Sequence, residues 1–355
     1  MARIRVLLAE DSLTVRKRLC QVVAADPELE LVGEAEDGRR AIELATSLRP
    51  DVITLDMAMP VMTGLAATEY IMAYCPTPIL IVSASTNRGE LFKTLDALAA
   101  GALDVLEKPL GDESDGSWER AFTARLKLLS RIKVITHPRG KLAPRATALL
   151  PTARARLEVH GDGRPRLVAI GASTGGPAAV QEILRGLPRD FPLPILLVIH
   201  IGLPFGGALA DWLDGISSLR VSFAADGEAL PEVGRCRVVL APPDHHLVVE
   251  RGRLRLTSTA ERHSCRPSVD VLFESLARDL GAGTIACLLT GMGRDGASGL
   301  LAVRQAGGVT IAQDQESSVV FGMPGEAVQL GAASRILPVS EIAEHLSTLA
   351  STGGR

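Results

Sequence analysis

The first 134 residues alternate short apolar runs with helical patterns, and this alternation constrains the fold more than any other feature. The apolar runs are IRVLLAE, ELVGEAE, DVITLDM, PILIVSA and DVLEKP, and helical patterns follow them at 12–25, 38–48, 65–74, 90–100 and 118–134. Neighbouring parallel strands need a long crossover, which is usually a helix. Five βα units in succession therefore predict a doubly wound, five-stranded parallel sheet.

A second α/β series begins after a segment of different composition. Residues 137–157 contain no acidic residue and are rich in proline and arginine, which indicates a linker. Further strands are predicted at RLVAIGAS, ILLVIH, RVSFAA, RVVLAPP, TIACLLTG and GVTIAQD, and a hairpin is predicted from HLVVERG and RLRLTST. We therefore expect a first domain at 1–135, a linker at 136–165 and a second, doubly wound α/β domain at 166–355.

Composition excludes several classes of protein. The 355 residues suffice for two cores, and a net charge of -3 gives no basic footprint for nucleic acid. No apolar run approaches the roughly 18 residues that span a bilayer, so we expect no direct membrane insertion. The cysteines form no Cys-x-x-Cys pair, which fits reduced thiols in a cytoplasmic protein and predicts five ordinary structural cysteines. They are Cys20, Cys75, Cys236, Cys265 and Cys287.

Acidic residues gather where the strands of the first domain end. Glu10 and Asp11 follow the first strand and Asp56 follows the third, so the three carboxylates can converge at one edge of the sheet. Such a set of oxygen ligands favours Mg²⁺, which commonly completes its shell with a phosphoryl group. Ser83 and Lys108 end the fourth and fifth strands and supply a hydroxyl and a cation there. Any one of these groups alone fits a solvated loop charge equally well, but together they indicate a phospho-acceptor pocket.

The motifs AEDS, LDMAMP with Gly64 after it, VSA and EKP resemble the response-regulator receiver family over residues 4–134. The resemblance implies a flavodoxin-like domain in which Asp56 is phosphorylated. It also implies Mg²⁺ ligands, phosphoryl contacts and a cis peptide before Pro109. The Mg²⁺ ligands would be Glu10, Asp11, Asp56 and the Ala58 carbonyl, and the phosphoryl contacts would be Ser83 and Lys108. This chain has Val105 where the family often has an aromatic residue that reports the conformational change.

Ser173 is the candidate nucleophile of the second domain. The run Gly171-Ala172-Ser173-Thr174-Gly175-Gly176 follows a strand and precedes a helical pattern, so the hydroxyl is expected on a sharp strand-to-helix turn. Amides of the following helix could stabilise an anion. The pattern alone is weak, because similar turns cradle phosphates or simply reverse the chain. It lacks the Gly-Lys-Ser/Thr of a P-loop, and Ser173 replaces a glycine that dinucleotide binding needs.

A serine nucleophile needs a base, and the base needs a third group that orients it. His200 ends the strand ILLVIH and would lie on the same edge as Ser173. Asp295 follows another apolar strand within TGMGRDG, a loop whose backbone amides are unhindered. On their own, His200 also fits a buried structural histidine and Asp295 an aspartate that holds a glycine-rich turn.

The motifs IGASTGG, VIH, HSCRPSVDVLF, LLTGMGRDG and TIAQDQESSVVFGMP resemble the CheB family, the protein-glutamate methylesterases/glutaminases of bacterial chemotaxis, over 166–349. By this resemblance Ser173 is the nucleophile, His200 the general base and acid, and Asp295 its orienting partner. Amides near Thr174 and Met292 would form the oxyanion hole, and the esterase needs no cofactor. The implied partners are methyl-accepting chemoreceptors as substrates and a chemotaxis-type histidine kinase as phosphodonor.

Other features leave alternatives open. Arg266 could position a substrate carboxylate or pair with a local acid. His245 and His246 are neighbours that point to opposite faces of a strand and cannot easily bind one metal.

A small-molecule α/β-hydrolase is a rival function, although the catalytic residues of that fold occur in the order Ser, acid, His. A non-catalytic regulator and a DNA-binding output domain are further rivals, but no basic recognition helix is evident.

Overall fold

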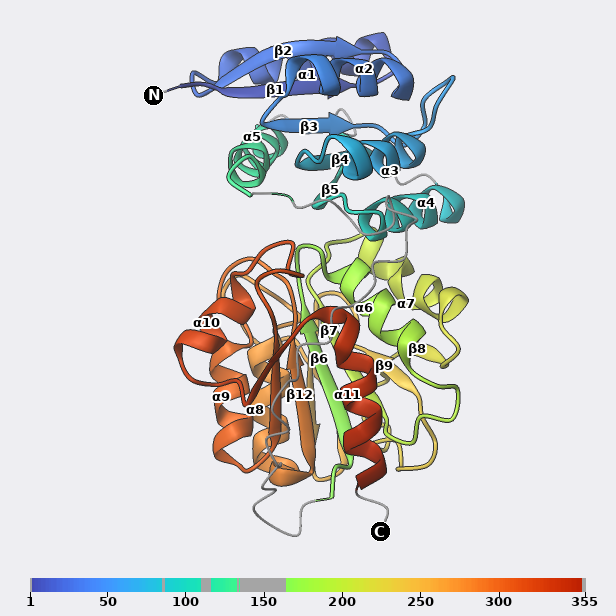
Figure 1. The fold of residues 1–355 in the computed structure, drawn as a ribbon, viewed down its shortest axis with the longest axis vertical. Coiled ribbons are helices and arrows are strands. Elements are labelled where there is room, and N and C mark those ends of the chain that lie inside the picture. Colours follow the sequence, from blue (N-terminus) through green and yellow to red (C-terminus); the bar gives the residue numbers. More distant parts are fainter. Residues whose placement is uncertain (1, 85–86, 110–115, 133, 135–163, 353–355) are drawn as a thin grey trace, which may run out of the picture.

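The computed structural model describes residues 2–84, 87–109, 116–132, 134 and 164–352. It contains two separate parallel sheets, each carrying helices on both faces (Figure 1). Nearly all of the expected linker, 136–165, lies outside the described residues. The predicted fold class, two α/β units with parallel sheets, is confirmed.

The first sheet has the strand order β2-β1-β3-β4-β5, and every pair is parallel. The strands are β1 (Ile4–Ala9), β2 (Leu29–Ala35), β3 (Val52–Leu55), β4 (Ile79–Ser83) and β5 (Asp104–Glu107). The helices are α1 (Leu13–Ala25), α2 (Gly38–Leu48), α3 (Gly64–Tyr74), α4 (Arg88–Ala99) and α5 (Ser117–Leu129). Helices α1 and α5 pack together, as do α2, α3 and α4. The strand order is that of a doubly wound, flavodoxin-like domain.

The second sheet has seven strands in the order β14-β13-β12-β6-β7-β9-β8, and again every pair is parallel. The strands are β6 (Leu167–Ala172), β7 (Ile195–Ile199), β8 (Val221–Phe223), β9 (Val238–Leu240), β12 (Thr284–Leu288), β13 (Val309–Gln313) and β14 (Arg335–Leu337). The helices are α6 (Gly176–Gly186), α7 (Phe205–Ile216), α8 (Val269–Asp279), α9 (Ala297–Gln305), α10 (Met323–Gln329) and α11 (Val339–Thr352). Strands β6, β7 and β12 are buried along their whole length, which explains their uninterrupted apolar sequences.

The predicted hairpin is present as β10 (His246–Glu250) and β11 (Arg253–Thr257), which pair antiparallel. Its turn residues Arg251 and Gly252 have φ values of 52° and 70°, the left-handed pair that tight hairpins require. Two details differ from expectation. Helix α5 ends at Leu129 rather than at 134, and the short strand β14 was not predicted. No helix among the described residues is both long and apolar enough to cross a membrane.

Helix α4 joins the two units by packing against α6 and α7 (Figure 1). At this junction the indole nitrogen of Trp212 donates a hydrogen bond to Asp96 Oδ1 at 2.9 Å, and Arg88 pairs with Asp211 at 2.9 Å. One cluster of buried apolar side chains continues from the first sheet into the second. The edge of the first unit formed by α4 and β5 therefore lies against the second unit.

Candidate active site and acidic pocket

The acidic pocket forms where β1, β3 and β5 end. The Lys108 ammonium lies 3.0 Å from Asp56 Oδ2 and 2.8 Å from Glu10 Oε2. Carboxylate oxygens of Glu10, Asp11 and Asp56 lie within 4.8 Å of one another. Ser83 is buried at the end of β4, on the same edge of the sheet. The structure thus brings the predicted pocket residues to one place.

The charges of this pocket fit a divalent cation. Burial and the neighbouring Asp56 charge raise the pKa of Glu10, although Lys108 opposes them. Burial lowers the pKa of Lys108, but Asp56 and Glu10 outweigh this effect and raise it. One lysine facing three carboxylates leaves the site short of positive charge, and oxygen ligands in this number suit Mg²⁺.

Two expectations concerned strand β5 and the loop after it. Val105 is buried in β5, at the place where the family often has an aromatic residue. The expected cis peptide before Pro109 is wrong: among the described residues, the cis peptide bonds are Leu203–Pro204 and Arg266–Pro267. The second of these lies in the loop that borders the candidate active site.

Ser173 lies on the turn between β6 and α6, as predicted. Its backbone N–H donates to Thr290 O at 3.0 Å, and its carbonyl accepts from Gly176 N at 2.7 Å. Gly175 has a φ of 77°, which favours glycine. A Cβ on Gly291 would lie 2.2 Å from Met323 Sδ and 2.8 Å from Ser173 Cβ, so only glycine fits against the serine. The Ser173 side chain stays partly exposed.

Asp295 is fixed by three donors at the N-terminus of α8 and by His200. Its oxygens accept hydrogen bonds from Ser268 Oγ at 2.7 Å, Val269 N at 2.7 Å and Asp270 N at 3.1 Å, and His200 Nε2 lies 2.9 Å away. Burial raises the pKa of Asp295, but the hydrogen bond and charge of His200 and the bonds from Ser268 and Val269 outweigh it and lower the pKa. Asp295 therefore stays ionised and holds the imidazole in one orientation.

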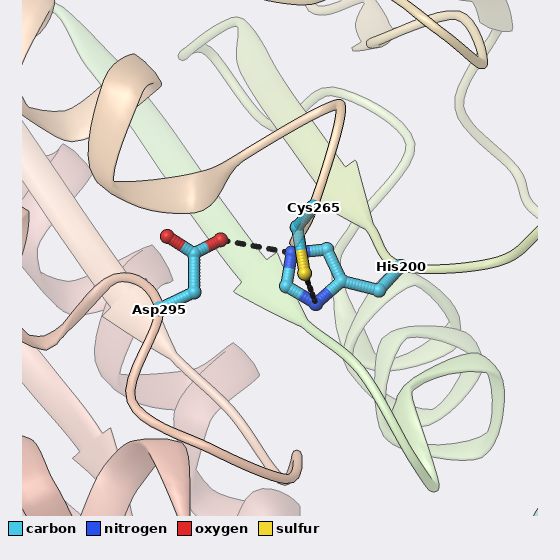
Figure 2. Close-up of side chains that lie close together, drawn as sticks. All are labelled: His200, Cys265 and Asp295. Atoms are coloured by element: carbon cyan, nitrogen blue, oxygen red, sulfur yellow. Dashed lines mark hydrogen bonds and ion pairs between the residues drawn. The ribbon is translucent and has the colours of Figure 1, made fainter. Parts of the chain in front are cut away.

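His200 lies between Asp295 and Cys265, which approach opposite nitrogens of its ring (Figure 2). A carboxylate only accepts hydrogen bonds, so Nε2 carries a proton and Nδ1 is the basic nitrogen. Cys265 Sγ lies 3.6 Å from Nδ1. Burial lowers the pKa of His200, but hydrogen bonds to Asp295 and Cys265 dominate and raise it to about 9. Cys265, expected to be an ordinary structural cysteine, thus contacts the ring of the candidate base.

Ser173 and His200 are neighbours on one rim, because His200 N donates to the carbonyl of Ala172 at 3.0 Å. No hydrogen bond joins their side chains among the described residues. The backbone N–H groups of Thr174 and Met292, within that same described part, donate no hydrogen bond, so both remain available to an oxyanion. Ser173, Thr174 and His200 line one cavity, Asp295 contacts His200, and Met292 follows Gly291, which lies against Ser173.

Two supporting residues were not predicted. Ser268 caps α8 and donates to Asp295 Oδ1, and it lies in the Arg-Pro-Ser run that drew attention only through its arginine. His246 is completely buried and orders the same loop, because its Nδ1 accepts from Ser268 N at 3.1 Å and its Nε2 lies 3.2 Å from Ala260 O. His246 therefore has a structural role in the loop that holds Asp295, which was not predicted from the sequence.

A cavity of about 570 Å³ lies between the two units. Ser173, His200 and Cys265 line it from the second unit, and Lys108 and Trp118 line it from the first. An oriented histidine beside a serine on a strand-to-helix turn defines a serine hydrolase, and the acidic pocket defines a phospho-acceptor domain facing it.

Comparison with known proteins agrees with both assignments. The CheB methylesterase family matches residues 168–346, and the response regulator receiver domain matches residues 6–114. A protein-glutamate methylesterase/protein-glutamine glutaminase of Anaeromyxobacter dehalogenans is 46% identical over 98% of this chain and 97% of that protein. Another protein of the same name, from Nitrosospira multiformis, is 43% identical over 99% of this chain and 98% of that protein. The solved structure of the Thermotoga maritima CheB methylesterase catalytic domain is 39% identical to this chain in sequence. The match covers 52% of this chain and 98% of that structure, with a TM-score of 0.49. The chain belongs to the CheB methylesterase family.

We expect ester hydrolysis to rise with pH up to about 9. His200 must be neutral to accept a proton, and its raised pKa keeps it protonated below that value. The kcat/KM for a small ester should thus rise about tenfold per pH unit below the midpoint. Cys265→Ala should move the midpoint to lower pH because it removes an acceptor for the Nδ1 proton. Cys236→Ala, a change outside the cavity, is the control. A wild-type midpoint near 6.5 would contradict this electrostatic picture.

Proposed function

We propose that this chain hydrolyses glutamyl methyl esters on chemoreceptors and deamidates receptor glutamines, and that phosphorylation of Asp56 releases this activity. The observation that carries the proposal is that His200, anchored by Asp295, lines one cavity with Ser173 and with Lys108 of the acidic pocket. The names of the relatives support the substrate, because this chain aligns with them over nearly its whole length.

The first half of the reaction forms an acyl enzyme. Ser173 Oγ attacks the ester carbonyl while His200 Nδ1 takes the hydroxyl proton. The resulting imidazolium is stabilised by Asp295, which is ionised and fixed by α8. The carbonyl oxygen becomes negative and accepts hydrogen bonds from the Thr174 and Met292 amides. His200 then returns the proton to the leaving methanol.

The second half frees the enzyme. Water attacks the acyl carbonyl, His200 takes the water proton, and the proton passes to Ser173 Oγ as the glutamate product leaves. A glutamine side chain passes through the same acyl enzyme, with ammonia in place of methanol as the leaving group. Both substrates therefore use Ser173, His200 and Asp295, and neither reaction needs a cofactor in this unit.

The receiver is the site of control. Asp56 takes a phosphoryl group from a chemotaxis-type histidine kinase, and Ser83 and Lys108 contact that group. Glu10, Asp11, Asp56 and the Ala58 carbonyl would hold Mg²⁺, which would neutralise phosphoryl charge. Lys108 lies between Glu10 and Asp56 before phosphorylation and must rearrange when the phosphoryl group arrives. The proposal places the receiver at 1–135, the linker at 136–165 and the enzyme at 166–355. The protein would act in the cytoplasm.

Inhibition in the unphosphorylated state follows from the packing of α4 and β5 against the enzyme. This edge of the receiver forms one wall of the cavity that contains Ser173 and His200, so it restricts access for a receptor helix. In the described part of the chain, the polar contacts of the junction include Trp212 with Asp96 and Arg88 with Asp211. Modest interfaces of this kind are readily shifted by a change in charge at a nearby pocket.

Methanol release from methylated receptors tests this function. We expect the unphosphorylated full-length protein to be slowest and the protein treated with acetyl phosphate and Mg²⁺ to be on the order of tenfold faster, a barrier change of about 1.4 kcal/mol. Asp96→Ala removes the acceptor of Trp212 and should raise the unphosphorylated rate. Asp190→Ala, an exposed change away from the junction, is the control. No methanol from any form would refute the activity, and an unaltered Asp96→Ala rate would refute inhibition by covering.

A further inference from the structure

Among the described residues that line the cavity from the enzyme's side, Arg266 carries the one fixed positive charge. The other side chains on this side of the cavity carry no fixed charge, although His200 and Cys265 can titrate. Ile201, Leu203 and Phe205 are apolar. Arg266 follows Cys265, which contacts His200, and it lines the same cavity as Ser173 and His200. A substrate bound in this cavity can therefore contact the arginine.

The guanidinium of Arg266 is incompletely paired. Its Nη1 donates to Thr259 O at 3.2 Å, and its buried Nε has no hydrogen-bond partner. No carboxylate pairs with it among the described residues. Arg262, in the same loop, is different: it pairs with Glu274 at 2.7 Å and with Asp270 at 3.6 Å. Helix α8 thus supplies two acids to one arginine of this loop, whereas Arg266 has no acidic partner in the described part of the chain.

A guanidinium that has no carboxylate partner, in a partly closed cavity, favours a carboxylate ligand. Arginine presents a planar set of donors that matches a carboxylate, and such charge-assisted hydrogen bonds are strong. A neutral substrate that fills the cavity would remove water from Arg266 without replacing its hydrogen bonds, which costs free energy. The apolar Ile201, Leu203 and Phe205 suit the aliphatic stems of the same substrate.

We propose that Arg266 is a specificity-determining residue that binds a carboxylate of the receptor helix next to the ester or amide being hydrolysed. The proposal rests on the methylesterase function above and deepens it, because it defines the substrate as an acidic segment. Hydrolysis itself creates a carboxylate from a neutral group. Demethylation of one site would therefore strengthen binding at a neighbouring site.

The test compares two synthetic helical peptides with the phosphorylated full-length protein. Each peptide carries one glutamyl methyl ester, flanked one turn away by glutamate in the first peptide and by glutamine in the second. We expect wild type to favour the acidic peptide about tenfold in kcat/KM, mainly through KM. Arg266→Gln should bring this ratio close to one, and Arg266→Lys should retain part of it. Arg235→Gln makes the same charge change at the opposite end of the sheet, before β9, and should leave the ratio unchanged.

Two further measurements keep the outcome decisive. Raising the ionic strength should lower the wild-type ratio without any substitution, since the ion pair is screened. If Arg266→Gln slows both peptides equally, the residue serves the oxyanion or the fold and the proposal is overturned. An unchanged ratio in Arg266→Gln would overturn it as well. Failure of the methylesterase function would be seen separately, because wild type would then release methanol from neither peptide, and the proposal would fall with it.

Discussion

Ser173→Ala is expected to abolish methanol release, with a loss on the order of 10⁶-fold by analogy with serine-protease triads. Without the hydroxyl no acyl enzyme forms, and only binding and the amides of Thr174 and Met292 remain to promote attack by water. The measurement is turnover of methylated receptors by the phosphorylated full-length protein. Ser218→Ala, at an exposed serine of the same domain, should keep wild-type turnover. Near-normal release by Ser173→Ala would rule out the assigned nucleophile.

The losses of turnover caused by substituting Ser173, His200 and Asp295 should not be additive. Ser173, His200 and Asp295 act in one proton-transfer step, so a Ser173→Ala, Asp295→Asn double variant should be no slower than Ser173→Ala alone. Asp295→Asn by itself should still be severe, because an amide cannot stabilise the imidazolium as the ionised carboxylate does. The three enzymes are compared at one pH below 9. Additive losses would mean that Asp295 supports the fold rather than the reaction.

The fold and both sets of chemical groups follow from a regular feature of the sequence. In a parallel sheet the carboxyl ends of the strands meet at one edge, so Asp56 after β3 and His200 after β7 could be placed from the strands alone. The same reasoning brought Lys108 to Asp56 and Asp295 to His200, and the observed contacts of 3.0 Å and 2.9 Å agree with it. What the residues do chemically stays a prediction that the substitutions test.

The parts that were not predicted come from irregular backbone and from contact between the two units. Cys265 reaches His200 from a loop in which His263 and Ser264 have φ values of 53° and 58°, and no periodic pattern predicts the course of such a segment. The Trp212–Asp96 contact joins surfaces that are 116 residues apart in sequence. Either surface alone has the composition of an ordinary amphipathic helix.

Asp56→Asn is expected to abolish phosphorylation by acetyl phosphate. The transfer requires a carboxylate oxygen of Asp56 to attack phosphorus while acetate leaves, and an amide is too poor a nucleophile to replace it. Lys108, which lies 3.0 Å from Asp56 Oδ2, should nevertheless keep the pocket folded through its contact with Glu10. Radiolabelled acetyl phosphate measures the effect directly, and removal of Mg²⁺ with a chelator should abolish labelling of wild type as well.

The control lies on the same strand. Asp51→Asn changes a carboxylate immediately before β3, at the opposite end from Asp56, and its side chain accepts a hydrogen bond from Arg5 N at 2.8 Å, which an amide oxygen can also accept. This variant should be labelled like wild type. Asp56→Asn should also lose the acceleration of methanol release by acetyl phosphate while keeping the slow unphosphorylated rate, because Ser173 and His200 are untouched. Labelling of Asp56→Asn at the wild-type level would place the phosphoryl group elsewhere. Loss of labelling with full acceleration retained would separate phosphorylation from control of the esterase, and the cavity shared by Lys108 and Ser173 would then have no regulatory meaning.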